Sequence, residues 1–204
     1  MLKIWGRTNS VNVKKVLWTA DELGLRYERI DAGRQFGVVD TPEYKKLNPN
    51  ALVPTIEDDG FVLWESHSIV RYLAAKYGAG TLWPNEPRAR ADADRWMDWA
   101  FTFQAAFRGL FWGLVRTPPE KRDQKAMEES RKKSAELLSI PDGALAGRPF
   151  LAGNFSMGDI PLGCHLQAWM RLPIERPAHP NLTAWFERLC ARPAFRKNVD
   201  IPLS

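Results

Sequence analysis

The chain has 204 residues, of which 45% are hydrophobic and 26% are charged, and its formal net charge is +5. This composition excludes a disordered chain, and the length suffices for one large domain or two small ones with buried cores. No apolar run approaches the roughly 20 residues of a membrane span, and the charged N-terminal stretch does not resemble a signal peptide. We therefore expect a cytoplasmic protein with no membrane partner.

The first 78 residues alternate between short strands and amphipathic helices. Apolar residues between Asn12 and Leu23 recur at helical spacing, and Asp59-Gly60 between two apolar runs is a strong hairpin signal. The order β-α-β-α-β-β-α predicts a thioredoxin-like α/β domain. The expected elements are strands at 2–5 and 27–31, helices at 12–23 and 42–48, strands at 53–57 and 61–65, and a helix at 66–77.

The remainder of the chain reads as helical. Residues 79–87 are rich in glycine and proline and predict a linker, after which residues 88–204 form an all-α domain. Lys and Arg alternate with Asp and Glu between 118 and 136, which is typical of a solvated helix face and argues against nucleic-acid binding. The helix signals are aromatic residues at three- and four-residue spacing from Trp96 to Leu114, a break at Thr117-Pro118-Pro119, the charged helix, a capping-box pattern Ser156-x-x-Asp159, and a last helix from about Pro180 through Leu189.

The two cysteines, Cys164 and Cys190, lie in apolar surroundings and are too far apart in sequence to form a CxxC pair. Without a secretion signal, we expect both to be reduced, buried and inert thiols rather than catalytic groups.

Val53-Pro54 is the first feature that points to a ligand. A proline that opens a strand cannot donate to the sheet, and in the cis form it would turn the preceding backbone outward. The N–H and C=O groups of Val53 would then pair with the peptide backbone of a ligand, as an added strand does. The alternative is a plain edge strand with a trans proline.

Glu65-Ser66 narrows the chemistry of that ligand. Ser66 opens a helix, so its hydroxyl and the first free N–H groups form an anion site, and Glu65 beside it is suited to an ammonium group. An ammonium and a carboxylate on one carbon, next to a peptide bond, describe the γ-glutamyl end of glutathione. The alternative is an ordinary N-cap preceded by a solvated acid.

With these residues in place, the chain resembles the cytosolic glutathione S-transferase family over nearly its whole length. The resemblance is carried by the VP…ESxxIxxYL block, the helical second half and the Ser-x-x-Asp box. It implies a glutathione-binding domain (1–78), a linker (79–87) and a helical domain (88–204) that shapes the acceptor-substrate site. It further implies that Val53, Pro54, Glu65 and Ser66 hold the tripeptide, that Ser156 and Asp159 form a folding element, and that glutathione is the cosubstrate, with no metal.

The residue that activates the thiol must donate a hydrogen bond near the end of the first strand. The stretch GRTNSVNVKKV offers Thr8, Asn9, Ser10 and Asn12, but no tyrosine or cysteine. This is similar to the theta-like, serine- or asparagine-using bacterial and fungal branch. Ser10 is the first candidate, Asn9 the second, and Asn12 an auxiliary glutathione contact. The alternative for Ser10 is a simple helix cap.

Aromatic residues at helical spacing usually belong to a core, but Phe101, Phe111 and Trp112 fall off the main face of their helix. One side of this helix is therefore expected to line an apolar acceptor pocket or a dimer contact. We assign Trp99, Phe103, Phe107 and Trp112 to the acceptor pocket. Arg95 and Arg108 are suited to anionic or polar groups there, and His67 is interpreted as structural or incidental.

The leading hypothesis is a glutathione transferase that conjugates the glutathione thiolate to hydrophobic electrophiles. The resemblance also implies a homodimer in which the helix at 69–77 and the fourth helix meet across a twofold axis. One alternative is glutathione-dependent reduction of peroxides or disulfides. Another is a non-catalytic binding protein of the same fold. Retention of the four tripeptide-binding residues favours the enzyme.

Overall fold

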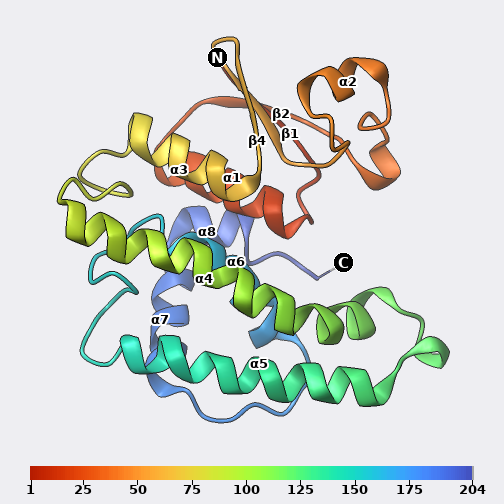
Figure 1. The fold of residues 1–204 in the computed structure, drawn as a ribbon, viewed down its shortest axis with the longest axis vertical. Coiled ribbons are helices and arrows are strands. Elements are labelled where there is room, and N and C mark those ends of the chain that lie inside the picture. Colours follow the sequence, from red (N-terminus) through yellow and green to blue (C-terminus); the bar gives the residue numbers. More distant parts are fainter. Residues whose placement is uncertain (204) are drawn as a thin grey trace.

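The structure is a computed structural model that describes residues 1–203. Its first part has the strand and helix order expected from the sequence (Figure 1). The elements of this part are β1 (Leu2–Trp5), α1 (Val11–Glu22), β2 (Tyr27–Ile30), the 3-10 turn η1 (Arg34–Phe36), α2 (Pro42–Leu47), β3 (Thr55–Asp58), β4 (Phe61–Trp64) and α3 (Ser66–Tyr77).

The four strands form one mixed sheet in the order β2-β1-β3-β4. β1 is parallel to β2 and antiparallel to β3, so that Ile4 lies opposite Arg29 on one side and Ile56 on the other. The predicted hairpin joins β3 to β4 through Asp59 and Gly60, whose φ angles of 50° and 86° are those of a tight hairpin turn. The thioredoxin-like prediction is therefore confirmed.

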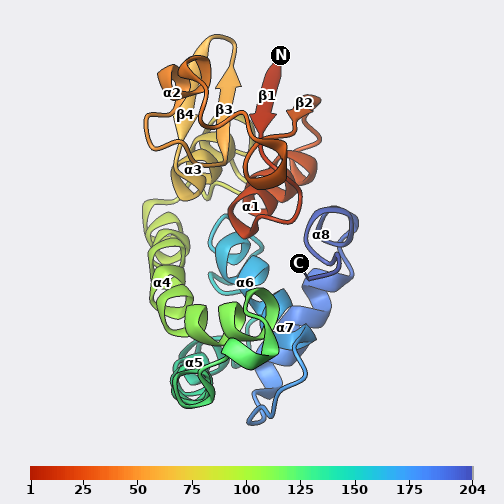
Figure 2. The same cartoon turned by 90° about the vertical axis from the view of Figure 1, so that its right-hand side faces the viewer.

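Side-chain alternation along β1 assigns the two faces of the sheet. Leu2 and Ile4 are buried against apolar residues of α1 and α3. Trp5 points to the opposite face and packs against a smaller cluster that contains Tyr44 of α2. Helices α1 and α3 thus cover one face, and α2 lies on the other (Figure 2).

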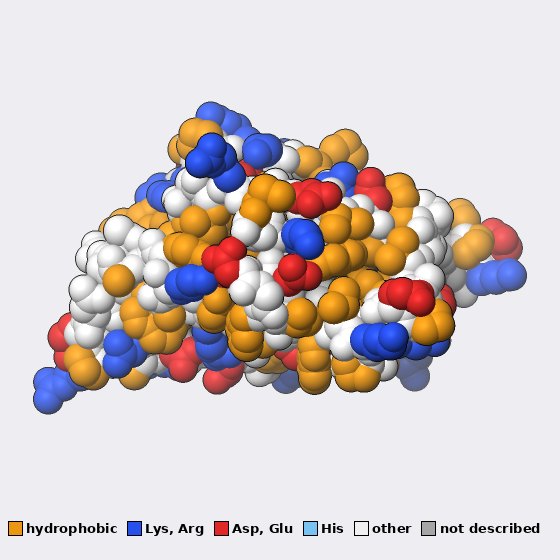
Figure 3. All heavy atoms as spheres, turned by 90° about the horizontal axis from the view of Figure 1, so that it is seen from above, with side chains coloured by type: hydrophobic (Ala, Val, Ile, Leu, Met, Phe, Trp, Pro, Cys, Tyr) orange, Lys and Arg blue, Asp and Glu red, His pale blue; other side chains and the backbone are white. Residues whose placement is uncertain are grey.

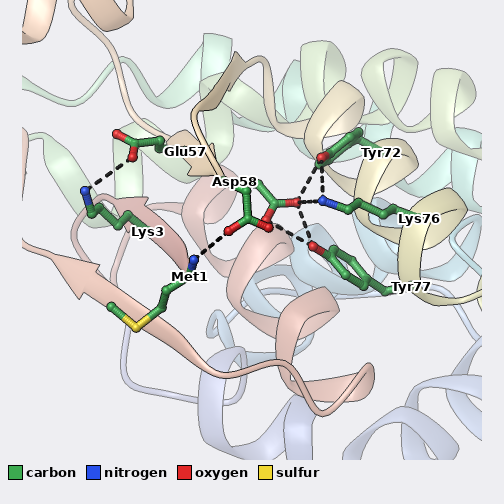
Figure 4. A network of polar contacts seen from close by, with 8 residues as sticks. Met1, Lys3, Glu57, Asp58, Tyr72, Lys76 and Tyr77 are labelled. Carbon is green, nitrogen blue, oxygen red and sulfur yellow. Dashed lines mark hydrogen bonds and ion pairs between the residues drawn. The ribbon is translucent and has the colours of Figure 1, made fainter.

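A buried carboxylate fixes α3 to the sheet. Asp58 at the end of β3 accepts hydrogen bonds from the Tyr72 hydroxyl, the Lys76 ammonium and the Tyr77 hydroxyl, each at 2.8 Å (Figure 4). Burial alone would raise the pKa of Asp58, but these hydrogen bonds from α3 bring it below its usual value. Tyr77 at the end of α3 is 39% exposed, although its hydroxyl contacts this carboxylate.

The second part is helical, as predicted. Its two longest helices, α4 and α5, pack side by side, and α6 lies behind them against α1 (Figures 1 and 2). No helix among residues 1–203 is long and apolar enough to cross a membrane. The elements are α4 (Pro87–Phe111), the π turn η2 (Trp112–Arg116), the 3-10 turn η3 (Pro119–Lys121), α5 (Gln124–Ala144), α6 (Asp159–Arg171), α7 (Pro180–Cys190) and α8 (Pro193–Asn198).

Two features of the helical part were not anticipated. The regular α4 helix ends at Phe111, and a π turn carries the chain to the predicted break at Thr117. After α7 the chain turns at Arg192-Pro193 into α8, which packs on α1. Irregular helical turns of this kind are frequent at functional sites.

The cores of the two parts are continuous. Trp18 of α1 and Val70 and Ala74 of α3 belong to the same buried cluster as the helical domain. The close approach of α1 to α6 depends on Gly163, since a Cβ there would lie 3.0 Å from the Trp18 ring. The relative position of the two domains is thus fixed by packing.

Candidate active site

A cavity of about 600 Å³ lies between the two domains, which is within the usual range for a small-molecule site. The first domain contributes the loop from β1 into α1, the loop that contains Gly33 and Arg34, and residues 51–53. The helical domain contributes the end of α4, the π turn, α6 and Pro202-Leu203. Six predicted site residues line this one cavity: Asn9, Ser10, Asn12, Val53, Phe107 and Trp112.

Ser10 lies where β1 turns into α1. It takes the N-cap position with φ −86° and ψ 122°, yet its side chain makes no capping hydrogen bond. Only 8% of Ser10 is exposed, at the cavity wall. Its hydroxyl is therefore not committed to the capping role considered as an alternative, and it lies at the helix end that favours negative charge. Asn9 and Asn12 line the cavity on either side of it.

The loop before β3 presents Val53 at the cavity. The Val53-Pro54 peptide bond is cis, as considered from the sequence, and Pro54 is buried beneath the half-buried Val53. The carbonyl of Leu52 accepts hydrogen bonds from the Tyr44 hydroxyl at 2.7 Å and the Asn48 amide at 2.9 Å. These bonds hold the backbone around Val53 in place.

Glu65 and Ser66 lie at the start of α3, as predicted. Ser66 is the first helical residue and is buried, whereas Glu65 is exposed. Glu65 has φ 72° and ψ 111°, a backbone conformation that a residue with a side chain seldom adopts and that is commonest at functional sites. Neither residue is part of the cavity lining itself.

Behind the lining lies a fully buried lysine, Lys15. Its ammonium donates to Asn12 Oδ1 and to His67 Nε2, both at 3.0 Å. Burial lowers the pKa of Lys15 to about 8, and burial, then Lys15, lowers that of His67 to about 2. An ammonium can only donate, so it fixes the amide oxygen of Asn12 towards itself and leaves the Asn12 N–H groups for another partner.

His67 has a structural role, in agreement with the sequence interpretation. Its neutral ring stacks on Phe101 of α4, with ring centroids 4.1 Å apart, and so joins α3 to the helical domain. Phe101 is nonetheless 48% exposed, on the side of α4 away from the core.

Positive charge dominates the cavity. Among residues 1–203, five cationic side chains line it, and no Asp or Glu does. Burial, followed by repulsion from Arg34 and Arg116, lowers the pKa of Arg7. Arg108, predicted to address polar groups, is among the lining residues, but Arg95 is exposed and pairs with Asp92 outside it. The five cations are Arg7, Lys14, Arg34, Arg108 and Arg116.

The aromatic wall consists of Phe107, Phe111 and Trp112. Two residues predicted for the acceptor pocket, Trp99 and Phe103, do not line the cavity. Phe103 is fully buried, stacks on Phe107 with centroids 5.3 Å apart, and meets the edge of Trp169 of α6. Trp99 is half-buried against the Trp96 ring. The structure thus places these two predicted residues outside the cavity lining, in contact with other aromatic residues of α4 and α6.

The cysteines are free thiols. Burial raises the pKa of Cys164 to about 12, so this thiol stays protonated near neutral pH although it touches the cavity. Cys190 is half-buried rather than buried, and burial raises its pKa as well. Within the described part of the chain, no group of three or more His, Cys, Asp or Glu side chains is arranged to hold a metal ion.

Ser156 and Asp159 lie at the start of α6, away from the cavity. Asp159 is fully buried and accepts from the Ser156 N–H at 3.0 Å, the reciprocal bond of a capping box. It also accepts from the Leu151 N–H and from Trp185 Nε1. The Ser156 hydroxyl accepts from the Gly158 N–H at 3.3 Å instead of from the N–H of Asp159. Burial raises the pKa of Asp159 to about 6.

Sequence reasoning missed Lys15, Arg7, Arg34 and Arg116. Arg7 had a usable signal, since it follows the first strand directly and precedes the candidate Ser10. Lys15 had none, because a lysine next to another lysine on a short helix is normally solvated. Arg34 and Arg116 are 82 positions apart in the sequence, and only the packing of the two domains brings both to one cavity.

Comparison with known proteins covers both domains. Residues 9–76 match the family model described as glutathione S-transferase, N-terminal domain, and residues 99–193 match glutathione S-transferase, C-terminal domain. The chain is 47% identical to glutathione S-transferase GstB of Escherichia coli strain K12 over the whole of both chains. It is 31% identical to glutathione S-transferase 3 of Zea mays over 99% of this chain and 95% of that protein.

A solved structure shows the same arrangement. The theta-class glutathione S-transferase of Xanthomonas axonopodis pv. citri, crystallised with glutathione bound, superposes with a TM-score of 0.95. It is 52% identical, and the match covers 100% of this chain and 99% of that one. The chain thus belongs to the glutathione S-transferase family, whose members are transferases, in agreement with the resemblance to the theta-like branch noted in its sequence.

Proposed function

We propose that the protein binds glutathione in the interdomain cavity and conjugates its thiolate to an electrophile held against the aromatic wall. The observation that carries this proposal is the gathering of Ser10, Asn12 and Val53 from one domain opposite Phe107 and Trp112 from the other. A polar, peptide-binding side and an apolar side are what a two-substrate reaction of this kind needs.

Each predicted contact has a role in binding one part of the tripeptide. Val53 offers its backbone N–H and C=O to the cysteinyl peptide of glutathione, as an added strand would. The γ-glutamyl carboxylate is suited to the Ser66 hydroxyl and the free N–H groups at the start of α3, and the γ-glutamyl ammonium to Glu65. The strained backbone at Glu65 supports a functional role for this position.

The sulfur then lies near the start of α1. A hydrogen bond from the Ser10 hydroxyl, or from Asn9, together with the helix dipole, stabilises the thiolate once the thiol proton has left to solvent. The thiolate sulfur forms a bond to the electrophilic carbon, and the leaving group departs with the electron pair of the broken bond. Catalysis rests on thiolate stabilisation and positioning.

The test is calorimetric titration of the protein with glutathione and with S-hexylglutathione. Binding of glutathione, tightened by the hexyl group, is the expected result. Glu65→Gln should weaken the affinity for both ligands by about tenfold, since a charge-assisted hydrogen bond is lost. The matched control is Glu28→Gln, which changes an exposed acid of β2. Absence of binding by either ligand would contradict the proposal.

Turnover assays distinguish conjugation from glutathione-dependent reduction of peroxides or disulfides. Glutathione binding without conjugation of a chlorodinitrobenzene, but with glutathione-dependent loss of a hydroperoxide or disulfide, would assign the site to reduction instead. Binding without either reaction would indicate a non-catalytic protein.

We further propose a cytoplasmic homodimer in which α3 and α4 meet their counterparts. Large apolar side chains exposed near these helices support this: Phe61 and Trp64 on β4, Tyr77 on α3 and Phe101 on α4. Light scattering on the protein as it elutes from a size-exclusion column should give twice the monomer mass of 23.3 kDa. A monomer at micromolar concentration would contradict it.

A further inference from the structure

The charge of the cavity differs from that of the outer surface. Viewed from the end of the first domain, Lys and Arg are interspersed with Asp and Glu and with hydrophobic patches (Figure 3). From the part of the chain that the structure describes, the cavity receives five cationic side chains and no acidic one. Such an excess of one sign raises the local concentration of anions and disfavours cations.

Four of the five cations are arginines, and none of the four forms an ion pair with a carboxylate of residues 1–203. Within residues 1–203, the arginines that do form ion pairs lie elsewhere on the molecule. The Arg7 Nε atom is buried without a hydrogen-bond partner. Arg7, Arg34 and Arg116 lie close enough to repel one another, across the boundary between the domains. An anion bound among them would remove this repulsion.

The helical-domain arginines are oriented by the aromatic wall. The Arg108 guanidinium lies 5.5 Å from the centroid of the Trp112 ring, and that of Arg116 lies 5.9 Å from the centroid of Phe111. A guanidinium beside a ring face keeps N–H groups for a carboxylate, which arginine can bind in a bidentate manner. Anion-binding edges and apolar ring faces are thus presented to the same space.

The π turn that carries Arg116 is fixed by hydrogen bonds from Arg122. Arg122 donates from Nε to the Thr117 carbonyl at 3.1 Å and from Nη2 to the Leu114 carbonyl at 3.0 Å. These bonds cross the π turn on both sides of Arg116. A side chain on a braced turn loses less freedom when it binds a ligand.

Glutathione does not account for all of this charge. In the proposed mode its γ-glutamyl end is held at Glu65-Ser66, which leaves only the glycyl carboxylate for the cations. Arg34 lies in the first domain, next to Gly33 and Val53, and is suited to that carboxylate. Arg108 and Arg116 lie on the opposite wall with the aromatic residues, on the side of the second substrate.

We propose that the second substrate is an aromatic electrophile that carries a carboxylate, bound by Arg116 and Arg108 while its ring lies against Phe111 and Trp112. This inference rests on the proposed conjugating function and names the substrate class of the same site. It differs from the expectation of a purely hydrophobic electrophile.

The first test measures binding and does not depend on turnover. S-(4-carboxybenzyl)glutathione and S-(4-carbamoylbenzyl)glutathione have nearly the same shape and differ in one charge. We expect the carboxy compound to bind about tenfold tighter or more, as a bidentate arginine contact would give. The preference should shrink as sodium chloride is raised. Equal affinity of the two compounds for the unaltered protein overturns the inference.

Variants assign the preference to residues. Arg116→Gln and Arg108→Gln should each bring the ratio of the two affinities toward one, with little change for the carbamoyl compound. Arg26→Gln, an exposed arginine outside the cavity, removes the same charge and should keep the ratio. A ratio that survives in both Arg116→Gln and Arg108→Gln contradicts their assignment. If S-benzylglutathione also fails to bind, the proposed function fails, not only the preference.

Kinetics complete the test. With 4-chloro-3,5-dinitrobenzoate, the thiolate sulfur bonds to the ring carbon and chloride leaves with the electrons of the C–Cl bond. We expect kcat/KM, divided by the uncatalysed rate, to exceed that for 4-chloro-3,5-dinitrobenzamide by about tenfold. Equal acceleration of the two would contradict the inference while leaving the conjugating function intact.

Discussion

At the scale of single residues, the thiol-activating role is the sharpest question. Ser10 has a hydroxyl free of capping bonds, at the N-terminal end of α1 and at the wall of the cavity. Ser10→Ala should lower turnover at least about tenfold, because the thiolate loses a hydrogen-bond donor. The pKa of the bound glutathione thiol, read from the pH profile of kcat/KM, should rise in the same variant.

Steady-state kinetics with a chlorodinitrobenzene provide the measurement, and Ser139→Ala, an exposed serine of α5, is the control. Unchanged turnover in Ser10→Ala would transfer the role to Asn9.

Lys15 gives a prediction about pH. Its pKa of about 8 in the folded protein lies below the 10.5 of a free lysine, because burial disfavours the charge. Between these values the unfolded chain binds more protons than the folded one, so the free energy of unfolding rises with pH. Relative to Lys15→Met, the unaltered protein should gain up to roughly 3 kcal/mol between pH 8 and 10.5.

Urea unfolding at several pH values measures this gain, with Lys133→Met as an exposed control. Stability curves that stay parallel for the unaltered protein and Lys15→Met would show that Lys15 does not titrate in this range.

At the scale of elements, the start of α6 lies directly against the backbone of α4. Gly158 precedes α6, and a Cβ there would lie 2.6 Å from the Ala93 carbonyl oxygen of α4. Backbone cannot yield as a flexible side chain can, so Gly158→Ala should destabilise the protein by about 1–3 kcal/mol. Chemical unfolding monitored by circular dichroism measures the change.

Gly143 provides the matched control. It lies inside α5, and an added Cβ would meet nothing within 4 Å. Gly143→Ala should therefore be neutral or stabilise by up to about 1 kcal/mol, since alanine favours the helix. Equal effects of the two substitutions would contradict the packing argument.

At the scale of the whole molecule, Trp18 joins the two domains. Although it belongs to α1, its ring is fully buried in the helical core and meets the Phe195 ring of α8 edge-on, with centroids 4.9 Å apart. On the same helix, Glu22 accepts two hydrogen bonds from Arg192. Contacts of this extent predict that both domains unfold in one transition.

Trp18→Ala should therefore lower the free energy of unfolding of the entire chain by about 3–5 kcal/mol. Unfolding followed by far-ultraviolet circular dichroism and by tryptophan fluorescence should give coincident, shifted curves. Two separate transitions in the unaltered protein would show that the domains unfold independently.

Local patterns in the sequence determined the elements and the positions predicted to bind the tripeptide. Hydrophobic periodicity located α1, α3 and α4, and Asp59-Gly60 determined the hairpin, since each depends on neighbours in the chain. Val53-Pro54 and Glu65-Ser66 were found in the same way, because a strand entry and a helix start are local features.

Only the tertiary structure decided which side chains share the cavity. Phe103 and Phe107 are one helical turn apart, yet one lies in the core and the other also reaches the cavity. Arg7, Arg34 and Arg116 come together where the two domains pack, and Lys15 of α1 is buried with its ammonium on His67 of α3. Periodicity gives the face of a helix but not the element that covers it, and burial and charge clustering depend on that partner.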